Sequence, residues 1–525
     1  MKLSDVYKFG TLAPAPGKFP VAGPDGYIDP AWLRPAANNI GTPGAQGFGV
    51  GVCPALPVGY APMVGTTDPA SDNYGNYIYV DGSVMVWVPA FWYKVGDGTN
   101  GMAVNALGIK RFSGYATQAA AAAEGYALHR AFFDGGVQPG FFVDKYQCSN
   151  NGGVASSLRY GAPLSTAAAH NPISALDGAP ANLYGGTIAA AHTRGGAFHP
   201  YSVFIYGALA MLSMAHGQAA TAATWCAWYD PAGVTNYPKG NNNNSLRDTN
   251  DTGVLYVSDG YSNCGQTGSG APFAKTTHNG QACGVADLNG NMYEIALGIQ
   301  CVATGKTITA ATQTNPVSLT VTGHGFATGD KVLCAGVVGM TQLNDRLFEI
   351  AVTDANTVTL PGVDGSAFTA YTSGGSLTRG LFYAAKPSAR MRDFTGGNTL
   401  ATDHWGAVGA AAAFNTLTPS FRTDYPNNGV SQRFGSGAAQ VLSPATSGNG
   451  WVMTGVGQPQ PSGVSPAGSN AFGQDYYYQY VRNEVCLLAG GSWSNGSNAG
   501  VWAVTWSLAR ANTDVSVGFR AASYL

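Results

Sequence analysis

Glycine and proline interrupt this chain so often that few long helices fit into it. The 525 residues include 73 glycines and 29 prolines, and only 10% of the residues are charged. This balance is typical of sheets and loops rather than of solvated helices. Hydrophobic residues make up 45% and aromatic residues 11%, which suffices for packed cores and excludes a disordered chain. A chain of this length predicts about two to four domains.

Local patterns predict both strands and helices. The alternation of apolar and polar residues in Ile78–Val95 indicates strands, and Gly140–Ser149 indicates a further strand. The alanine-rich stretch Ala116–Leu128 predicts a helix. Ser202 stands as an N-cap before an apolar run that reaches Gln218, which predicts a largely buried helix. We therefore expect an α+β protein with much irregular loop.

The first 77 residues and residues 303–379 differ from the rest. Prolines recur from Pro14 to Pro43, which predicts an extended N-terminal segment. Its stretch Phe19–Ala36 resembles a short segment of phage tail and tail-fibre proteins, which implies an attachment role toward other phage tail proteins for residues 1–77. Residues 303–379 contain short alternating strands with regular turn residues, which predicts a small all-β inserted domain. Its TGHGFATGDKV and GMTQLNDRLFEI segments resemble a module of phage tail proteins.

Motifs on both sides of this insertion resemble the formylglycine-generating-enzyme branch of the C-type-lectin-like fold. They are HNGQACGVADLNGNMYEI, with Asp287, Asn291 and Glu294 at matching positions, and the later GGSW and GFR motifs, which end at Arg520. The resemblance implies one lectin-like domain in two parts, residues 78–302 and 380–525. Asp287 and Asn291 suit the satisfaction of loop amides. Arg520 suits a buried planar hydrogen-bonding hub.

Several partner and site classes are not expected. The formal net charge is −2 and no basic run occurs, so we expect no nucleic-acid partner. No apolar run is long enough for a membrane span, and the start lacks the pattern of a secretory signal. The eight cysteines include no C-x-x-C pair, although a bridge between Cys264 and Cys283 stays open. We expect no metal and no cofactor.

The same resemblance raises the question of an enzyme. Formylglycine-generating enzymes use a cysteine pair, one member of which directly follows the GFR motif. Here Ala521 follows Arg520, and no cysteine lies beyond Cys486. A histidine set for a non-haem iron is not evident either. The sequence therefore predicts no catalytic residues and no enzyme.

The C-terminal stretch Gly490–Ala522 combines three tryptophans with Gly, Ser and Asn. It resembles the variable region of phage receptor-binding proteins that a diversity-generating retroelement diversifies, of the major tropism determinant type. A fixed lectin-like surface is the alternative that stays open. Aromatic side chains on a fixed backbone give large contact area at low entropic cost. The residues expected to contact a receptor are Ser492, Ser494, Asn495, Trp502, Thr505, Trp506, Ser507, Leu508, Asn512, Asp514, Val515 and Ser516.

Together these features predict a phage tail-fibre or tail-tip protein in the virion. It would serve host adhesion by binding a cell-surface protein or glycan, as a homotrimer. A head or tail decoration protein with a lectin-like domain is the alternative. A formylglycine-generating-type oxidase is the third reading.

Overall fold

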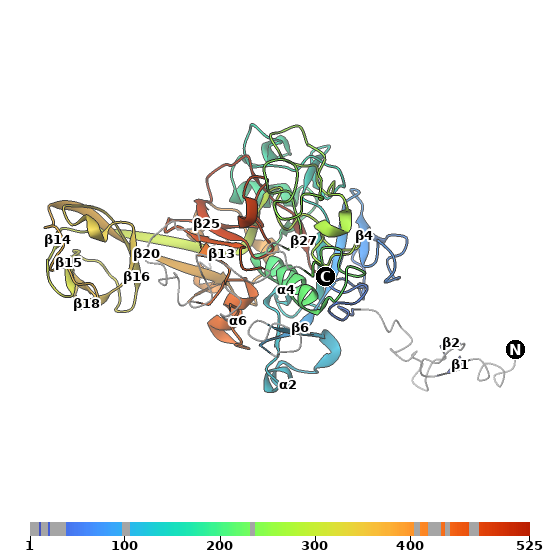
Figure 1. Cartoon of the computed structure of the whole chain (residues 1–525), viewed down its shortest axis with the longest axis horizontal. Coiled ribbons are helices and arrows are strands. Elements are labelled where there is room, and N and C mark those ends of the chain that lie inside the picture. The colour runs from blue at the N-terminus through green and yellow to red at the C-terminus, as the bar shows by residue number, and fades with distance from the viewer. Residues whose placement is uncertain are drawn as a thin grey trace.

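The computed structural model describes residues 10–11, 19–20, 38–96, 106–231, 237–403, 410–417, 432–435, 441–460 and 472–525. A body built from two large sheets and many loops carries a β-module, residues 308–376, at one end (Figure 1). Residues 21–36 of the expected attachment segment lie outside the described residues. In the part of the chain that is described, no helix is long and apolar enough to cross a membrane.

A six-stranded sheet forms one side of the body, in the order β12-β27-β9-β5-β4-β3. Its strands are β3 (Tyr60–Pro62), β4 (Asn76–Tyr79), β5 (Val84–Pro89), β9 (Gly140–Asp144), β12 (His199–Pro200) and β27 (Ala521–Ser523). β5 and β9 are buried along almost their whole length, whereas the edge strand β3 is largely exposed, so the middle of this sheet belongs to the core of the body.

A ten-stranded sheet runs from the body into the module; eight of its strands follow the order β17-β16-β20-β13-β24-β25-β23-β22. They are β13 (Tyr293–Thr307), β16 (Lys331–Val338), β17 (Arg346–Glu349), β20 (Ser373–Ala385), β22 (Gln432–Arg433), β23 (Tyr476–Gln479), β24 (Val485–Ala489) and β25 (Val504–Ala509). β21 (Phe414–Thr416) pairs with β20, and β26 (Val517–Gly518) pairs with β13.

Smaller sheets complete the strands. β6 (Phe91–Val95), β7 (Leu107–Arg111) and β8 (Ala127–Leu128) form one, and β14 (Ala310–Ala311), β15 (Val317–Thr320), β18 (Ala351–Asp354) and β19 (Thr357–Leu360) form another. Two further pairs are β1 (Gly10–Thr11) with β2 (Phe19–Pro20) and β10 (Ser149–Asn151) with β11 (Val154–Ser156).

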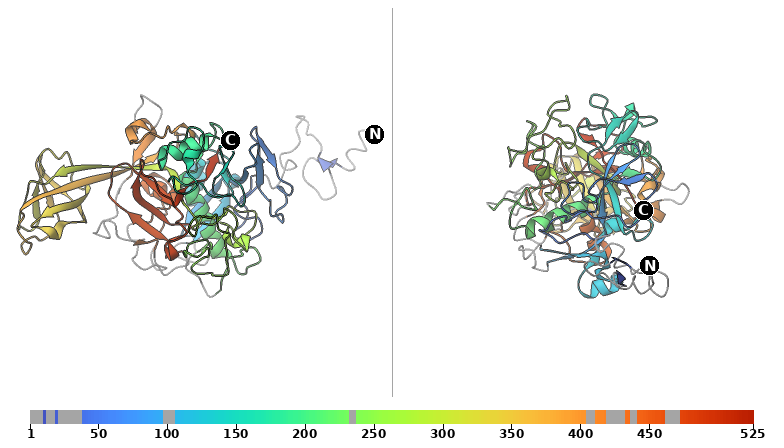
Figure 2. Two further views of the ribbon diagram at one scale, coloured as in Figure 1. Left: turned by 90° about the horizontal axis from the view of Figure 1, so that it is seen from above. Right: turned by 90° about the vertical axis from the view of Figure 1, so that its right-hand side faces the viewer.

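The helix α4 (Val203–Ala219) crosses the middle of the body beside β13 (Figures 1 and 2). Its N-cap is Ser202, whose Oγ accepts a hydrogen bond from the Ile205 amide at 3.2 Å, so the predicted cap is confirmed. Residues 203–216 are all buried, as the apolar run predicted. The other helices are α2 (Gln118–Ala123), α3 (Tyr184–His192), α5 (Ala410–Ala413) and α6 (Gly448–Gly455).

Other local predictions meet with mixed results. The strands predicted in Ile78–Val95 and Gly140–Ser149 are present as β4, β5, β6 and β9. The helix predicted over Ala116–Leu128 is shorter, because the chain leaves it at Glu124 and takes a left-handed conformation at Gly125. All eight cysteines lie among the described residues; each is buried and none forms a disulfide, so Cys264 and Cys283 are not bridged. The C-type-lectin-like fold stays a prediction.

Arg520 ties the two large sheets together. Its Nε and Nη2 donate to the two carboxylate oxygens of Glu294, each at 2.6 Å, and both side chains are buried. Nη1 donates to the carbonyl of Asp144 at 3.1 Å and Nη2 to that of Ala286 at 2.9 Å. Glu294 lies on β13 and Asp144 on β9, so one guanidinium holds both sheets and a loop. The predicted hub at Arg520 is confirmed.

The loop that begins at Asp287 supports this hub. Asp287 and Asn291 have left-handed backbones, with φ of 60° and 67°. The Asp287 carboxylate accepts hydrogen bonds from the Gly268 amide and the Tyr256 hydroxyl. Asn291 donates to Gln147 and to the carbonyl of Gly265. These bonds satisfy loop groups that no sheet reaches, as the sequence predicted.

Replacing Arg520 should lower the free energy of unfolding strongly. In Arg520→Ala, the Glu294 carboxylate stays buried without its partner, which costs about 3–5 kcal/mol. Urea denaturation followed by circular dichroism measures this loss. Glu124→Gln, in the exposed Lys110–Glu124 pair, is the matched control and should leave the midpoint unchanged. Equal midpoints for both variants would contradict the role of Arg520.

Candidate functional site

The segment predicted to bind a receptor lies largely in the core. β25 runs between β24 and β23 in the ten-stranded sheet. Trp502 and Trp506 are each 1% exposed. The ring of Trp502 stacks on Phe434 at 4.7 Å between centroids, and that of Trp506 packs on Phe382 at 4.2 Å. Both tryptophans therefore stabilise the body and present no surface to a partner.

The other predicted contact residues differ in exposure. Ser492 and Thr505 are buried as well. The remaining residues are exposed at Ser494 and Asn512 and half-buried at Asn495, Ser507, Leu508, Asp514, Val515 and Ser516. Some of them hold the loop itself: the Asn495 side-chain carbonyl accepts from the Ser492 amide and hydroxyl. The predicted receptor face thus lacks its tryptophan anchors, because distant segments cover them.

Trp506→Ala should act on stability. Removal of a fully packed tryptophan leaves a large cavity and should lower the free energy of unfolding by about 3–5 kcal/mol. Ser494→Ala, at an exposed position of the same segment, is the control and should unfold at the wild-type denaturant concentration. Urea denaturation of both variants checks this. A Trp506→Ala chain as stable as the control would restore an exposed role for the tryptophan.

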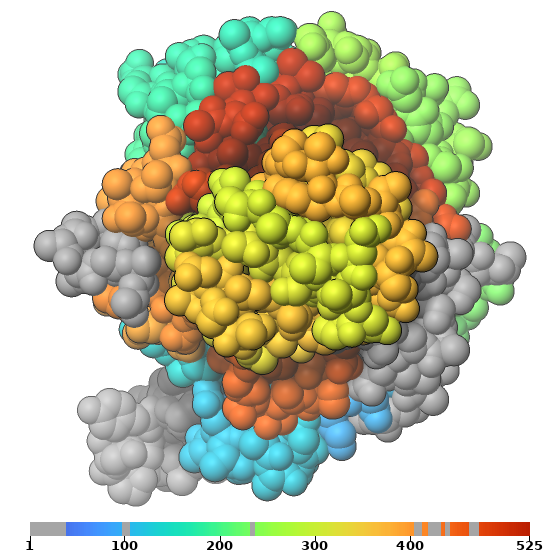
Figure 3. Space-filling model, turned by 90° about the vertical axis from the view of Figure 1, so that its left-hand side faces the viewer, coloured from blue at the N-terminus to red at the C-terminus, as the bar shows by residue number. Residues whose placement is uncertain are grey.

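The β-module is the part of the molecule that is presented most openly. β13 and β20 pair from Ile299↔Ala384 to Thr307↔Ser376 without a break in register. Along β13 the residues change from buried in the body to mostly exposed beyond Val302. The two strands thus form a ribbon that carries the module away from the body (Figure 1). Seen from that end, the module stands in front of the C-terminal residues (Figure 3).

The module has its own hydrophobic core. The core includes Val317, Leu319, Val332, Val358 and Leu360, all fully buried. His324 is part of the same packing: it stacks on Phe326 and its Nδ1 accepts from the Phe326 amide. The module is therefore a folded unit and not a loop draped over the body.

The outer surface of the module is poor in charge and rich in small polar residues. Several charged side chains are paired with one another: Lys331 with Glu349, and Arg379 with Asp330 at 2.9 Å. One large apolar side chain of the module is exposed, Val338 at 52%. It lies at the outer end of β16, where it pairs with Ser373 at the far end of the ribbon. Val338 was not predicted from the sequence, because the alternating pattern of its strand does not indicate which end faces outward.

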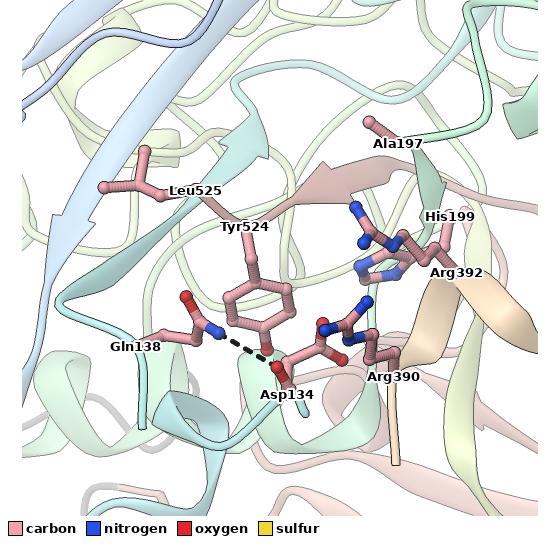
Figure 4. Close-up of a pocket in the computed structure, with 8 residues that line it drawn as sticks. All are labelled: Asp134, Gln138, Ala197, His199, Arg390, Arg392, Tyr524 and Leu525. Atoms are coloured by element: carbon pink, nitrogen blue, oxygen red, sulfur yellow. Dashed lines mark hydrogen bonds between the residues drawn. The ribbon is translucent and has the colours of Figure 1, made fainter. Parts of the chain in front are cut away.

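A small polar hollow in the body is a second candidate. Asp134, His199, Arg390 and Arg392 converge on a cavity of about 70 Å³ (Figure 4). The Asp134 Oδ1 accepts from the Met391 amide at 2.7 Å. Burial raises the pKa of Asp134 to about 6 and lowers the pKa of His199 to about 4. The two arginines and the small volume suit at most a small anion. The Asp134 carboxylate is already engaged by the Met391 amide.

In the comparison with known proteins, a family model matches most of the β-module. The family model described as the ubiquitin-activating enzyme E1 FCCH domain matches residues 315–379. These residues contain β15 to β19 and the first half of β20. No curated protein matches the chain. The match thus concerns the projecting module and not the body.

This match overturns the predicted identity of the chain. A module of ubiquitin-activating enzymes contradicts the phage tail fibre, the host receptor and phage tail partners, and the place in a virion. The decoration protein and the retroelement-diversified segment were parts of the same prediction and are wrong with it. Nothing supports the trimer. The match also removes the ground for excluding an enzyme, since the matching family model is described as a domain of an enzyme.

Proposed function

We propose that the chain is a protein-binding component that presents its β-module, residues 308–376, to a folded partner protein. The match to a domain of ubiquitin-activating enzyme E1 carries the proposal. The name of that enzyme says that it activates ubiquitin. A protein of the ubiquitin type is therefore the first partner to test. For the body we keep the C-type-lectin-like fold as a proposal. Its role in this proposal is to hold the module in position.

The geometry of the module supports a partner of this kind. The module has its own core and sits on a two-stranded ribbon, so a folded protein can approach its outer end without meeting the body. Exposed apolar side chains at the centre of a polar surface are typical of protein interfaces. Val338 is an exposed apolar side chain at the end of β16, with Ser373 and Gly374 beside it. The low charge around it favours contact by shape and hydrogen bonds over electrostatic steering.

Removal of the module tests the proposal. Residues 308–375 are replaced by Asn-Gly, so that Thr307 and Ser376 remain the last cross-strand pair and a two-residue turn closes the ribbon. Isotope-labelled ubiquitin is titrated with the full chain and with the shortened chain, and amide chemical shifts are followed. We expect shifts with the full chain only. Equal shifts with both chains, or none with either, would reject the proposed ubiquitin-type partner.

A point change locates the contact. Val338→Asp places a charge on the exposed end of β16 and should weaken ubiquitin binding about tenfold, which corresponds to about 1.4 kcal/mol. Because Val338 is half-exposed, the module should still fold. Thr353→Asp, at an exposed position of β18 in the other sheet of the module, is the matched control and should bind like wild type. Equal weakening by both changes would exclude Val338 as the contact.

A further inference from the structure

Three side chains with different metal-binding atoms meet inside the body, away from the module. They are His170, Asp259 and Cys264, whose ligand atoms all lie within 4.8 Å of one another. The side chains of His170 and Asp259 are almost completely buried, and Cys264 is fully buried. Imidazole, carboxylate and thiolate are the three ligand types that Zn²⁺ takes in proteins. We propose that these residues bind one Zn²⁺ ion.

The surroundings of the His170 ring favour a cation. Nδ1 lies 2.8 Å from the carbonyl oxygen of Val515, and Nε2 lies 2.6 Å from Oδ2 of Asp259. Both partners are acceptors, and a neutral imidazole has one N–H for the two of them, so the ring needs either a second proton or a metal ion on Nε2. A Zn²⁺ ion would take the place of that second proton, and Nε2 and Oδ2 would then move apart from 2.6 Å, because zinc binds each of these atoms at about 2.0–2.2 Å. Nδ1 then keeps its proton for the carbonyl, the usual outer support of a metal-binding histidine.

The other two ligands are also held in place. Oδ1 of Asp259 accepts from the Tyr261 amide at 2.8 Å, which leaves Oδ2 turned toward His170. The Asp259 amide donates to the carbonyl of Cys264 at 3.0 Å, so both ligands belong to one tight loop. The Tyr261 ring stacks on His170 at 4.2 Å between centroids. Sγ of Cys264 lies 3.7 Å from Sδ of Met292, the nearest further soft atom.

The donor set selects the class of metal. Ca²⁺ and Mg²⁺ prefer oxygen ligands only, whereas a thiolate beside an imidazole favours Zn²⁺ and related transition metals. On binding, the Cys264 thiol releases its proton to solvent and the sulfur takes the metal, while Nε2 and Oδ2 give lone pairs. No oxidation or reduction occurs. The ion would join the loop at Asp259–Cys264 to His170 and, through Val515, to the C-terminal segment.

The sequence holds no sign of this site. His170 lies 89 residues from Asp259, and the remaining pair has no zinc-ligand spacing. The inference is independent of the proposed partner of the module, because none of the three residues lies in residues 308–376.

Metal binding by the full chain tests the site directly. The chain is stripped with a chelator, loaded with Zn²⁺ or Co²⁺, and freed of excess metal. We expect one zinc per chain by elemental analysis and a thiolate-to-cobalt charge-transfer band with Co²⁺. X-ray absorption at the zinc edge should show one sulfur at about 2.3 Å, with the other ligands nitrogen or oxygen. Absence of bound zinc, or bound metal without a sulfur ligand, would overturn the proposal.

Variants assign the site to these residues. Cys264→Ser and His170→Gln should each weaken Zn²⁺ binding at least tenfold and, for Cys264→Ser, abolish the charge-transfer band. Cys334→Ser, at a buried cysteine in the core of the module, is the matched control. It should keep the wild-type Zn²⁺ affinity and the charge-transfer band. A band of full strength in Cys264→Ser would overturn the assignment. If the site variants fail to fold, the wild-type spectra alone decide whether a thiolate binds the metal.

Discussion

The guanidinium of Arg520 is the point at which the two large sheets of the body depend on one another. A buried charge costs several kcal/mol unless each of its polar groups finds a partner. Here a bidentate carboxylate and two carbonyls from separate parts of the chain provide those partners. Because the groups come from β9, β13 and the loop before β13, the hub forms only when all three have taken their places. The hydrogen bonds of Arg520 therefore depend on the correct packing of both large sheets.

The features that the sequence predicted well are those fixed by near neighbours. The cap at Ser202, the buried helix after it and the strands between Ile78 and Val95 follow from residues a few positions apart. Arg520 was predicted as a hub from its motif, and its partners bear this out. For the cap, the helix and the strands, the pattern lies within one short stretch of chain, whereas the partners of Arg520 come from Asp144, Ala286 and Glu294 and could not be named from the motif.

The features that the sequence predicted wrongly depend on distant residues. An aromatic segment among Gly, Ser and Asn looks the same whether it faces solvent or lies in a sheet. Trp502 and Trp506 are buried because Phe434 and Phe382, from other parts of the chain, cover their rings. The meeting of His170 with Asp259 is likewise a result of the fold. No local periodicity records such contacts.

The strand β13 has a consequence beyond the sheet it belongs to. Its first residues hold Arg520 through Glu294, and its last residues carry the module. The paired stretch from Ile299 to Thr307 spans about 27 Å at the usual rise of an antiparallel strand. A force applied to the module would therefore be transmitted along β13 toward the buried ion pair of Glu294 and Arg520. A partner bound at the outer end of the module would therefore be separated from the body by the length of this paired ribbon.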